Sequence, residues 1–328
     1  MNDPVNIAAQ KKSGRPAKPP AENMVWVPGG SFTMGSDKHY PEEAPAHPVT
    51  VDGFWMGQYP VTNAQFSRFI EEANYVTLAE RAPNPEDYPG AKPAMLVPAS
   101  VVFRKPRHRV DLRDHYNWWT YVPGANWRHP LGPESTLKGL AKHPVVHVAY
   151  EDAEAFAKWA GGELPTEAEW EFAARGGLEG AEFVWGDEFV PGGRQMANTW
   201  QGEFPNENLL EDGYEWAAPV GSFPPNGYGL YEMAGNVWEW TTDWYQEHGQ
   251  LVNSCCAQIN PRGGELEASY DPRMPEIKIP RKVMKGGSYL CAPNYCRRYR
   301  PAARMSQPVD TSTCHLGFRL IVRRGENG

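Results

Sequence analysis

The chain has 328 residues, and its 40 acidic against 32 basic side chains give a formal net charge of −8. An acidic chain lacks the basic face that non-specific nucleic-acid binding needs, and no run approaches the roughly 18 apolar residues of a transmembrane helix. Gly and Pro number 32 each, an excess that predicts many turns and loops.

The N-terminal segment 1–23 is polar and rich in Pro, Lys and Ala, and we expect it to be a disordered lead-in. It has no apolar core of the kind found in a secretory signal. The chain has five cysteines, and an odd count without a signal favours free thiols and a reducing, cytoplasmic compartment. Residues 24–328 are expected to form a single domain.

In the first part of the domain, apolar residues alternate around a Gly-Gly pair over 24–36, which predicts a hairpin. A second strand is expected within 47–62. Thr62 and Asn63 then resemble a helix N-cap, because apolar residues follow at helical spacing over 64–74. The stretch 78–144 is rich in Pro, Trp and His and is predicted to be irregular, and so long a loop is often functional.

Around the middle of the chain, the β-branched run at 144–149 predicts a strand, followed by a helix that ends at Gly161. Thr166, with Glu169 three residues later, predicts the capping box of a further helix that stops at Gly176. Short strands and loops are expected from there to the end. Few helices, all in the first half, indicate an α+β domain and not a doubly wound sheet.

The segment KGGSYLCAPNYCRRYRPAAR holds two cysteines, Cys291 and Cys296, five residues apart. Neither a helix nor a strand places this spacing on one face, but the Pro293-Asn294 pair favours a turn that would bring the sulfurs together. Two converging thiolates suit Cu(I) better than zinc, which prefers four ligands. The spacing alone gives somewhat better odds to two buried structural thiols or one disulfide.

The chain resembles the formylglycine-generating enzymes, also called sulfatase-modifying factors, over most of residues 24–323. The matching segments include VPGGSFTMGS, GANWRHPLGP, LPTEAEWEFAARGG, GYGLYEMAGNVWEWTTDWY and the cysteine segment. Most of these mark the broad superfamily, whereas the cysteine pair is typical of the aldehyde-forming branch. The resemblance implies a variant of the C-type lectin fold with low secondary-structure content.

By that resemblance, Cys291 and Cys296 are the copper ligands, and the target cysteine of a sulfatase precursor joins them as a third thiolate. Molecular oxygen and a thiol reductant would then convert this cysteine, within a Cys-x-Pro-x-Arg motif, to formylglycine through loss of a Cβ hydrogen. The resemblance further places other residues at the active site or the peptide groove: Ser288, Tyr295, Trp238, Trp118 and His315. His315 stands where the family carries asparagine, so we expect it to hydrogen-bond in the pocket and to titrate between about pH 5 and 8. Copper ligation, or packing against Trp238, is the alternative for His315.

The resemblance also implies two calcium sites, whose oxygen donors suit Ca²⁺. The first set is Asn198 and Asp212 with the carbonyls of Thr199 and Tyr214. The second is Glu232 and Glu239 with the carbonyls of Gly235 and Val237. A solvated acidic loop is the plainer alternative at each set. At position 232 the family relative has asparagine, so the first set is the safer expectation.

Several other features carry weaker expectations. His143 and His147 are four apart, but their β-branched run reads as a strand, so we do not expect them to bind a metal. Cys255, Cys256 and Cys314 receive no function. The bridging cysteines of animal relatives match Ala157, Ala174, Pro301 and Leu320 here, so no structural disulfide is expected. Two other functions stay open: a non-catalytic lectin-like binding module and an iron-dependent oxygenase of small thiols.

Overall fold

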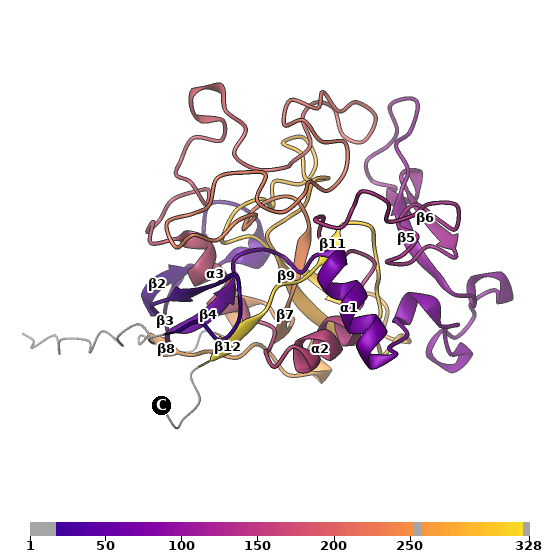
Figure 1. Cartoon of the computed structure of the whole chain (residues 1–328), viewed down its shortest axis with the longest axis horizontal. Coiled ribbons are helices and arrows are strands. Elements are labelled where there is room, and N and C mark those ends of the chain that lie inside the picture. Colours follow the sequence, from indigo (N-terminus) through magenta and orange to yellow (C-terminus); the bar gives the residue numbers. More distant parts are fainter. Residues whose placement is uncertain (1–17, 252–256, 324–328) are drawn as a thin grey trace, which may run out of the picture.

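The computed structural model describes residues 18–251 and 257–323. Four α-helices are present in this part of the chain: α1 (Asn63–Ala73), α2 (Tyr150–Trp159), α3 (Glu167–Arg175) and the one-turn α4 (His248–Leu251). Loops make up much of the molecule and gather on the side opposite α2 (Figure 1). The prediction of an α+β domain with few helices is confirmed, although α4 lies in the second half of the chain.

Short strands form four small sheets within the described residues. The central sheet has the order β10 (Arg304–Pro308), β9 (Arg281–Lys285), β7 (Trp238–Trp244) and β11 (Leu316–Gly317). A second sheet joins β1 (Met24–Val27), β4 (Phe54–Gly57) and β12 (Ile321–Arg323), and a third joins β2 (Gly30–Met34), β3 (His47–Val51) and β8 (Gln258–Ile259). The fourth pairs β5 (Ala99–Phe103) with β6 (Trp119–Pro123).

The predicted hairpin at the start of the domain is wrong. Strand β1 pairs with β4 and strand β2 pairs with β3, so the Gly-Gly pair carries the chain from one sheet to another. Gly29 has φ +72°, and a Cβ there would lie 2.6 Å from the Val51 carbonyl oxygen. The single strand expected within 47–62 is likewise two strands, β3 and β4, in different sheets.

The helix caps agree with the sequence. Thr62 Oγ1 accepts the Gln65 amide and the Gln65 side chain accepts the Thr62 amide, which closes a capping box at the start of α1. Thr166 and Glu169 form the same box on α3, which ends at Gly176 in the left-handed conformation. These local hydrogen bonds explain why both helix starts could be read from sequence.

Two expectations about loops are corrected. The segment 144–149 is not a strand: only Pro144 makes a bridge, to Thr62, and His147 has φ +60°, which interrupts extended backbone. The stretch 78–144 is not wholly irregular, because it contains β5 and β6. These strands pair with each other across the 104–118 segment, and Val101 also bridges Thr313.

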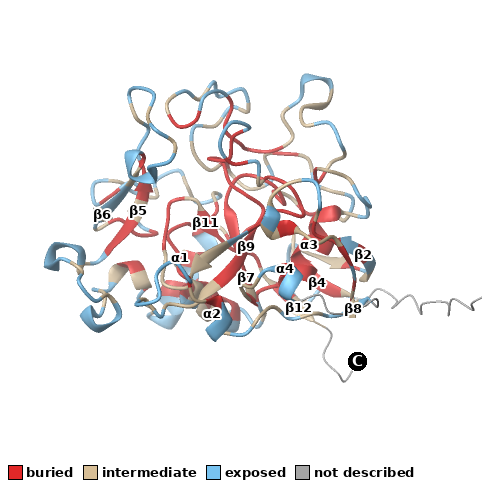
Figure 2. Ribbon diagram, turned by 180° about the vertical axis from the view of Figure 1, so that it is seen from behind, coloured by how far each residue is buried: buried red, intermediate tan, exposed pale blue. Residues whose placement is uncertain are grey.

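Buried residues run through the centre of the molecule (Figure 2), and their side chains form two groups. The larger packs the helices onto the central sheet and includes Cys291 and Cys296. The second aromatic cluster consists of Phe103, Trp118, Trp200, Phe204, Tyr289, Leu290, Ala292 and Cys314. The cysteine segment contributes residues to both groups, so it lies where the two cores meet.

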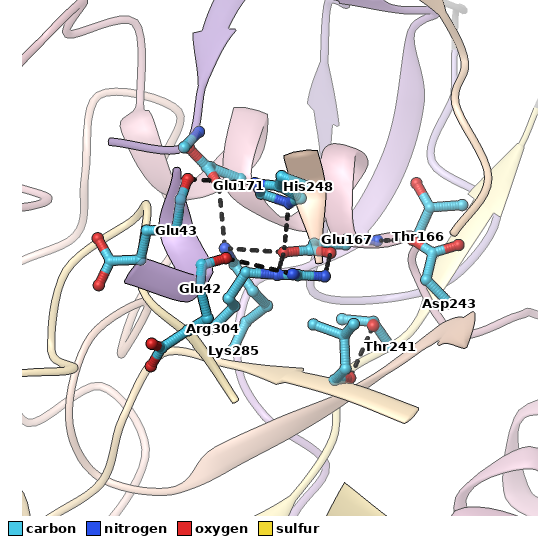
Figure 3. A network of polar contacts seen from close by, with 12 residues as sticks. Glu42, Glu43, Thr166, Glu167, Glu171, Thr241, Asp243, His248, Lys285 and Arg304 are labelled. Carbon is cyan, nitrogen blue, oxygen red and sulfur yellow. Dashed lines mark hydrogen bonds and ion pairs between the residues drawn. The ribbon is translucent and has the colours of Figure 1, made fainter. Parts of the chain in front are cut away.

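A network of buried ion pairs ties α3 to the central sheet (Figure 3). Arg304 donates to both oxygens of Glu167, at 2.7 and 2.8 Å, and Lys285 Nζ lies 2.9 Å from Glu171 Oε2. Each buried charge has an opposite charge nearby, which offsets the cost of removing it from water. No helix of the described chain is long and apolar enough to cross a membrane.

Candidate active site

The cysteine segment leaves β9 through Gly286 and Gly287. Gly287 has φ +72°, and a Cβ there would lie 2.8 Å from the Arg298 carbonyl oxygen, so only glycine allows the chain to fold back this closely. Ser288 O then accepts the Cys291 amide at 2.9 Å, and Ala292 O accepts the Cys296 amide at 2.9 Å. These two turns, with Pro293-Asn294 at the bend, bring the cysteines together as the sequence predicted.

The two thiols form a close pair. Cys291 Sγ and Cys296 Sγ lie 2.9 Å apart, longer than the roughly 2.05 Å of a disulfide. Both are free thiols in this structure, and their side chains are buried. The pair can therefore present two soft sulfur donors to one metal ion.

The surroundings favour one negative charge on the pair. The pKa of Cys296 is lowered to about 7, first by the hydrogen bond from the Cys291 thiol and then by the Arg298 guanidinium, whose Nη1 lies 3.9 Å from the sulfur. Burial raises the pKa of Cys291, so Cys291 holds its proton. Arg298 is fixed by Glu42, with Nε 3.2 Å from Oε1. The sequence analysis missed this arginine, although it stands two residues after Cys296.

Tyr295 connects the thiol pair to the molecular surface. Its side chain is 39% exposed and stacks on Phe204, with ring centroids 4.6 Å apart. Trp118 meets the Tyr295 ring edge-on at 5.3 Å but is only 1% exposed. Trp118 therefore supports the aromatic wall from inside, and the expectation that it lines an open peptide groove is wrong for this structure. Phe204 was not predicted.

Two other candidate residues are buried near the pair. Ser288 is fully buried, and its Oγ accepts the Leu290 amide at 3.2 Å, so it shapes the turn before Cys291. Trp238 is 2% exposed and belongs to the same core group as both cysteines. Trp238 is therefore a packing residue of the larger core group.

His315 packs against Trp119, the residue that follows Trp118. Its Nδ1 is 2.6 Å from Thr313 Oγ1, its ring packs edge-on against Trp119 at 4.9 Å, and its carbonyl accepts the Trp238 amide. Burial, with a smaller effect of His147, lowers the pKa of His315 to about 3. The expected titration between about pH 5 and 8 is therefore wrong, because the ring stays neutral there.

His147 has a structural role. Its Nε2 lies 2.8 Å from Pro130 O and its Nδ1 lies 2.6 Å from Ser100 Oγ, so both ring nitrogens are engaged. Among the described residues, no group of three or more His, Cys, Asp or Glu side chains is arranged to hold a metal ion. Cys255 and Cys256 lie outside the described residues.

The first calcium set is brought together by the fold. Asn198 Oδ1 is buried and has no hydrogen-bond partner among the described residues. Asp212 Oδ2 accepts the Thr199 amide at 3.0 Å, and Asp212 Oδ1 accepts the Tyr214 amide at 3.0 Å. The side-chain amide of Gln201 donates through Nε2 to both Thr199 O and Asp212 Oδ2. These oxygen donors fit a hard cation such as Ca²⁺, and the unpartnered Asn198 Oδ1 is consistent with a bound cation.

The second calcium set does not fit a cation. Arg319 donates to both oxygens of Glu239, at 2.6 and 2.8 Å, and Trp170 Nε1 adds a third bond at 2.7 Å. The Glu232 carboxylate accepts the Gly221 amide, and burial raises its pKa to about 7. The Arg319 guanidinium already neutralises Glu239, so the expected set of Glu232, Gly235, Val237 and Glu239 does not fit Ca²⁺, and Glu239 is corrected to a structural ion-pair residue.

Comparison with known proteins places the chain in a family. Residues 9–324 match the model described as "Sulfatase-modifying factor enzyme 1-like domain". The chain is 52% identical to the formylglycine-generating enzyme of Mycobacterium tuberculosis over 91% of this chain and 97% of that protein. It is 45% identical to the mouse enzyme of that name, over 90% and 74%.

Two further matches bear on activity and fold. The mouse protein named inactive Cα-formylglycine-generating enzyme 2 is 38% identical over 92% of this chain and 86% of its own length. The structure of PvdO from Pseudomonas aeruginosa superposes with a TM-score of 0.60 at 22% identity, over 91% and 93% of the two chains. That likeness confirms the predicted fold class. The family match and the curated relatives show that the chain belongs to the sulfatase-modifying factor enzyme 1-like family.

Proposed function

We propose that this chain is an active formylglycine-generating oxidoreductase, which converts a cysteine of a sulfatase precursor to formylglycine with dioxygen and Cu(I). The proposal depends above all on the thiol pair, whose sulfurs lie 2.9 Å apart in a buried position beside the exposed Tyr295. A buried pair of free thiols that reaches the surface through an aromatic wall is the arrangement needed to join a third, peptide thiol.

Cys291 and Cys296 would hold the copper, which would supply one-electron chemistry with dioxygen when bound. The hydrogen bond from Cys291 and the Arg298 charge lower the pKa of Cys296 to about 7, so in about half of the molecules at pH 7 loading the site requires the release of only the Cys291 proton. Tyr295 and Phe204 limit the access of water and orient the peptide. Oxidation of the cysteine yields two electrons whereas dioxygen accepts four, so a thiol reductant must supply the remainder.

We also propose that Ca²⁺ binds the first set, Asn198, Thr199, Asp212 and Tyr214, and stabilises the loop region without joining the chemistry. The unpartnered Asn198 Oδ1 supports this proposal. In this role the cation would replace the contacts that the Gln201 amide makes to Thr199 and Asp212.

The proposed activity is tested by mass spectrometry of a Cys-x-Pro-x-Arg peptide after incubation with enzyme, Cu(I), dioxygen and a thiol. We expect the peptide to lose its sulfur and gain a carbonyl. An unmodified peptide under all metal conditions would support the non-catalytic alternative, for which the inactive mouse relative is a precedent. Conversion that follows iron and not copper would support the iron oxygenase.

A further inference from the structure

A cluster of positive charge interrupts this acidic chain in the segment before Trp118. The segment Arg104–Arg113, here termed the basic loop, carries five Lys or Arg side chains among ten residues, whereas the whole chain has a net charge of −8. The five are Arg104, Lys105, Arg107, Arg109 and Arg113. The fold has therefore concentrated positive charge at a place where the overall composition does not require it.

Two of the five charges are not used by the fold. Lys105 and Arg107 are exposed and make no ion pair within residues 18–251 and 257–323. Arg113 pairs with Asp111 beside it in the loop, and Arg104 donates to the Leu131 carbonyl at 2.8 Å. Two cations therefore remain available to an outside partner.

Apolar residues hold the basic loop in place. Val110 and Leu112 pack against the second aromatic cluster, and the Arg104 amide donates to Trp118 O at 2.7 Å. The loop is thus anchored through its apolar side chains and its backbone. Its charged side chains face solvent from a fixed base, which is how a surface selects a charged ligand with little loss of entropy.

A short chain of contacts links the basic loop to the reaction centre. Arg109 Nη2 lies 3.8 Å from Glu203 Oε2. The next residue, Phe204, stacks on Tyr295 at 4.6 Å, and Tyr295 directly precedes Cys296. An extended peptide advances about 3.3 Å per residue, so a chain that places its cysteine at the thiol pair can reach the loop within a few residues.

We propose that the basic loop binds acidic side chains that flank the target cysteine on one side of the substrate polypeptide. This inference depends on the proposed function, because it assumes that a peptide occupies the thiol site. Lys105 and Arg107 are the two residues that select the substrate. The loop meets the site through Glu203 and Phe204, on one side of Tyr295, so the preference for acidic residues applies to one flank of the target cysteine and not to both.

Binding separates this inference from the chemistry. Fluorescent peptides with serine in place of the target cysteine carry runs of Glu, Gln or Lys on either flank, and anisotropy gives each Kd. We expect the peptide with Glu on one flank to bind about three- to tenfold tighter at low salt than the peptide with Gln on that flank, as for a few exposed ion pairs. Raising the salt to about 0.5 M should largely remove the difference.

Two matched double variants make the test specific. Lys105→Gln/Arg107→Gln should bring the Glu-to-Gln ratio of Kd close to one, and Lys105→Glu/Arg107→Glu should favour the Lys peptide. The control, Arg68→Gln/Lys158→Gln, removes two positive charges from the exposed faces of α1 and α2, as the Gln variant of the loop does. It should keep the wild-type ratio. Equal binding of Glu and Gln peptides on both flanks would overturn the inference, as would a wild-type ratio in the loop variants.

The same peptides with cysteine restored test the proposed function independently. Absence of formylglycine with an intact flank preference would refute the activity and leave the binding surface standing. Conversion without any flank preference would refute the basic loop and leave the activity standing.

Discussion

Replacing Arg298 by Gln removes the cation that lies 3.9 Å from Cys296 Sγ. At that separation a unit charge interacts with a thiolate by about 1 kcal/mol in water and about 4 kcal/mol at the effective dielectric constant of a protein surface. The Arg298 side chain is 19% exposed and is shared with Glu42, so we take a value near the lower end. One pKa unit corresponds to about 1.4 kcal/mol, so we expect the pKa of Cys296 to rise by about one unit.

That shift has a measurable effect on metal loading. The pKa of Cys296 is about 7, so about half of the thiol is ionised at pH 7, and a rise of about one unit leaves about a tenth. Copper binds the thiolate, so the apparent Cu(I) affinity at pH 7 should fall about fivefold and recover above pH 9. Thiolate absorbance of the metal-free protein and competition with a Cu(I) chelator, both measured across pH, give the two quantities.

The neighbouring Arg297 provides the matched control. Its Nη2 pairs with Glu182 at 2.7 Å, and its side chain is 46% exposed, so Arg297→Gln should leave the thiolate titration unchanged. Arg298→Lys should restore part of the effect because it keeps the charge. An Arg298→Gln titration that overlies the wild type would refute the electrostatic role of Arg298.

Three further outcomes follow from the structure. Chelation of Ca²⁺ should lower the melting temperature and Asp212→Ala should abolish the response, because a ligand of the folded state alone stabilises it; an unchanged melting curve would count against the site. His315→Asn should keep the pH profile of kcat/KM between about pH 5 and 8. The folded ring stays neutral to about pH 3 while the unfolded ring gains its proton near pH 6.5, so wild type should lose more unfolding free energy than His315→Asn as pH falls through that interval. Glu43→Gln should cost about 3 kcal/mol in urea unfolding, because it leaves the 1% exposed Arg300 guanidinium without its counter-charge; a cost below 1 kcal/mol would refute that reasoning.

Local chemistry was predictable from the sequence. The caps at Thr62 and Thr166, and the turn that unites Cys291 and Cys296, each depend on residues within five positions of one another. Partners of strands were not predictable, because alternation of apolar residues says which face is buried but not which strand lies beside it. The pairing of β1 with β4, and not with β2, shows this limit.

The site was predicted in the same uneven way. Glu239 carries ligand-type oxygens, but its partner Arg319 is eighty positions away, and no local pattern reveals that pair. The burial that lowers the pKa of His315 is likewise a property of the tertiary structure. Arg298 was visible beside the cysteines, but its contact with Cys296 Sγ required the fold to bring it back.

The central claim is that the thiol pair holds the copper that oxidises a peptide cysteine. The most direct test is to add Cu(I) stepwise to metal-free enzyme with the Cys-x-Pro-x-Arg peptide, dioxygen and a thiol, and to measure formylglycine by mass spectrometry. We expect the rate to rise with copper and to saturate at one equivalent per chain, and Cys291→Ser and Cys296→Ser to show no turnover with an unchanged melting temperature. Formylglycine formed at the wild-type rate by either variant, or without copper under chelation, would contradict the claim.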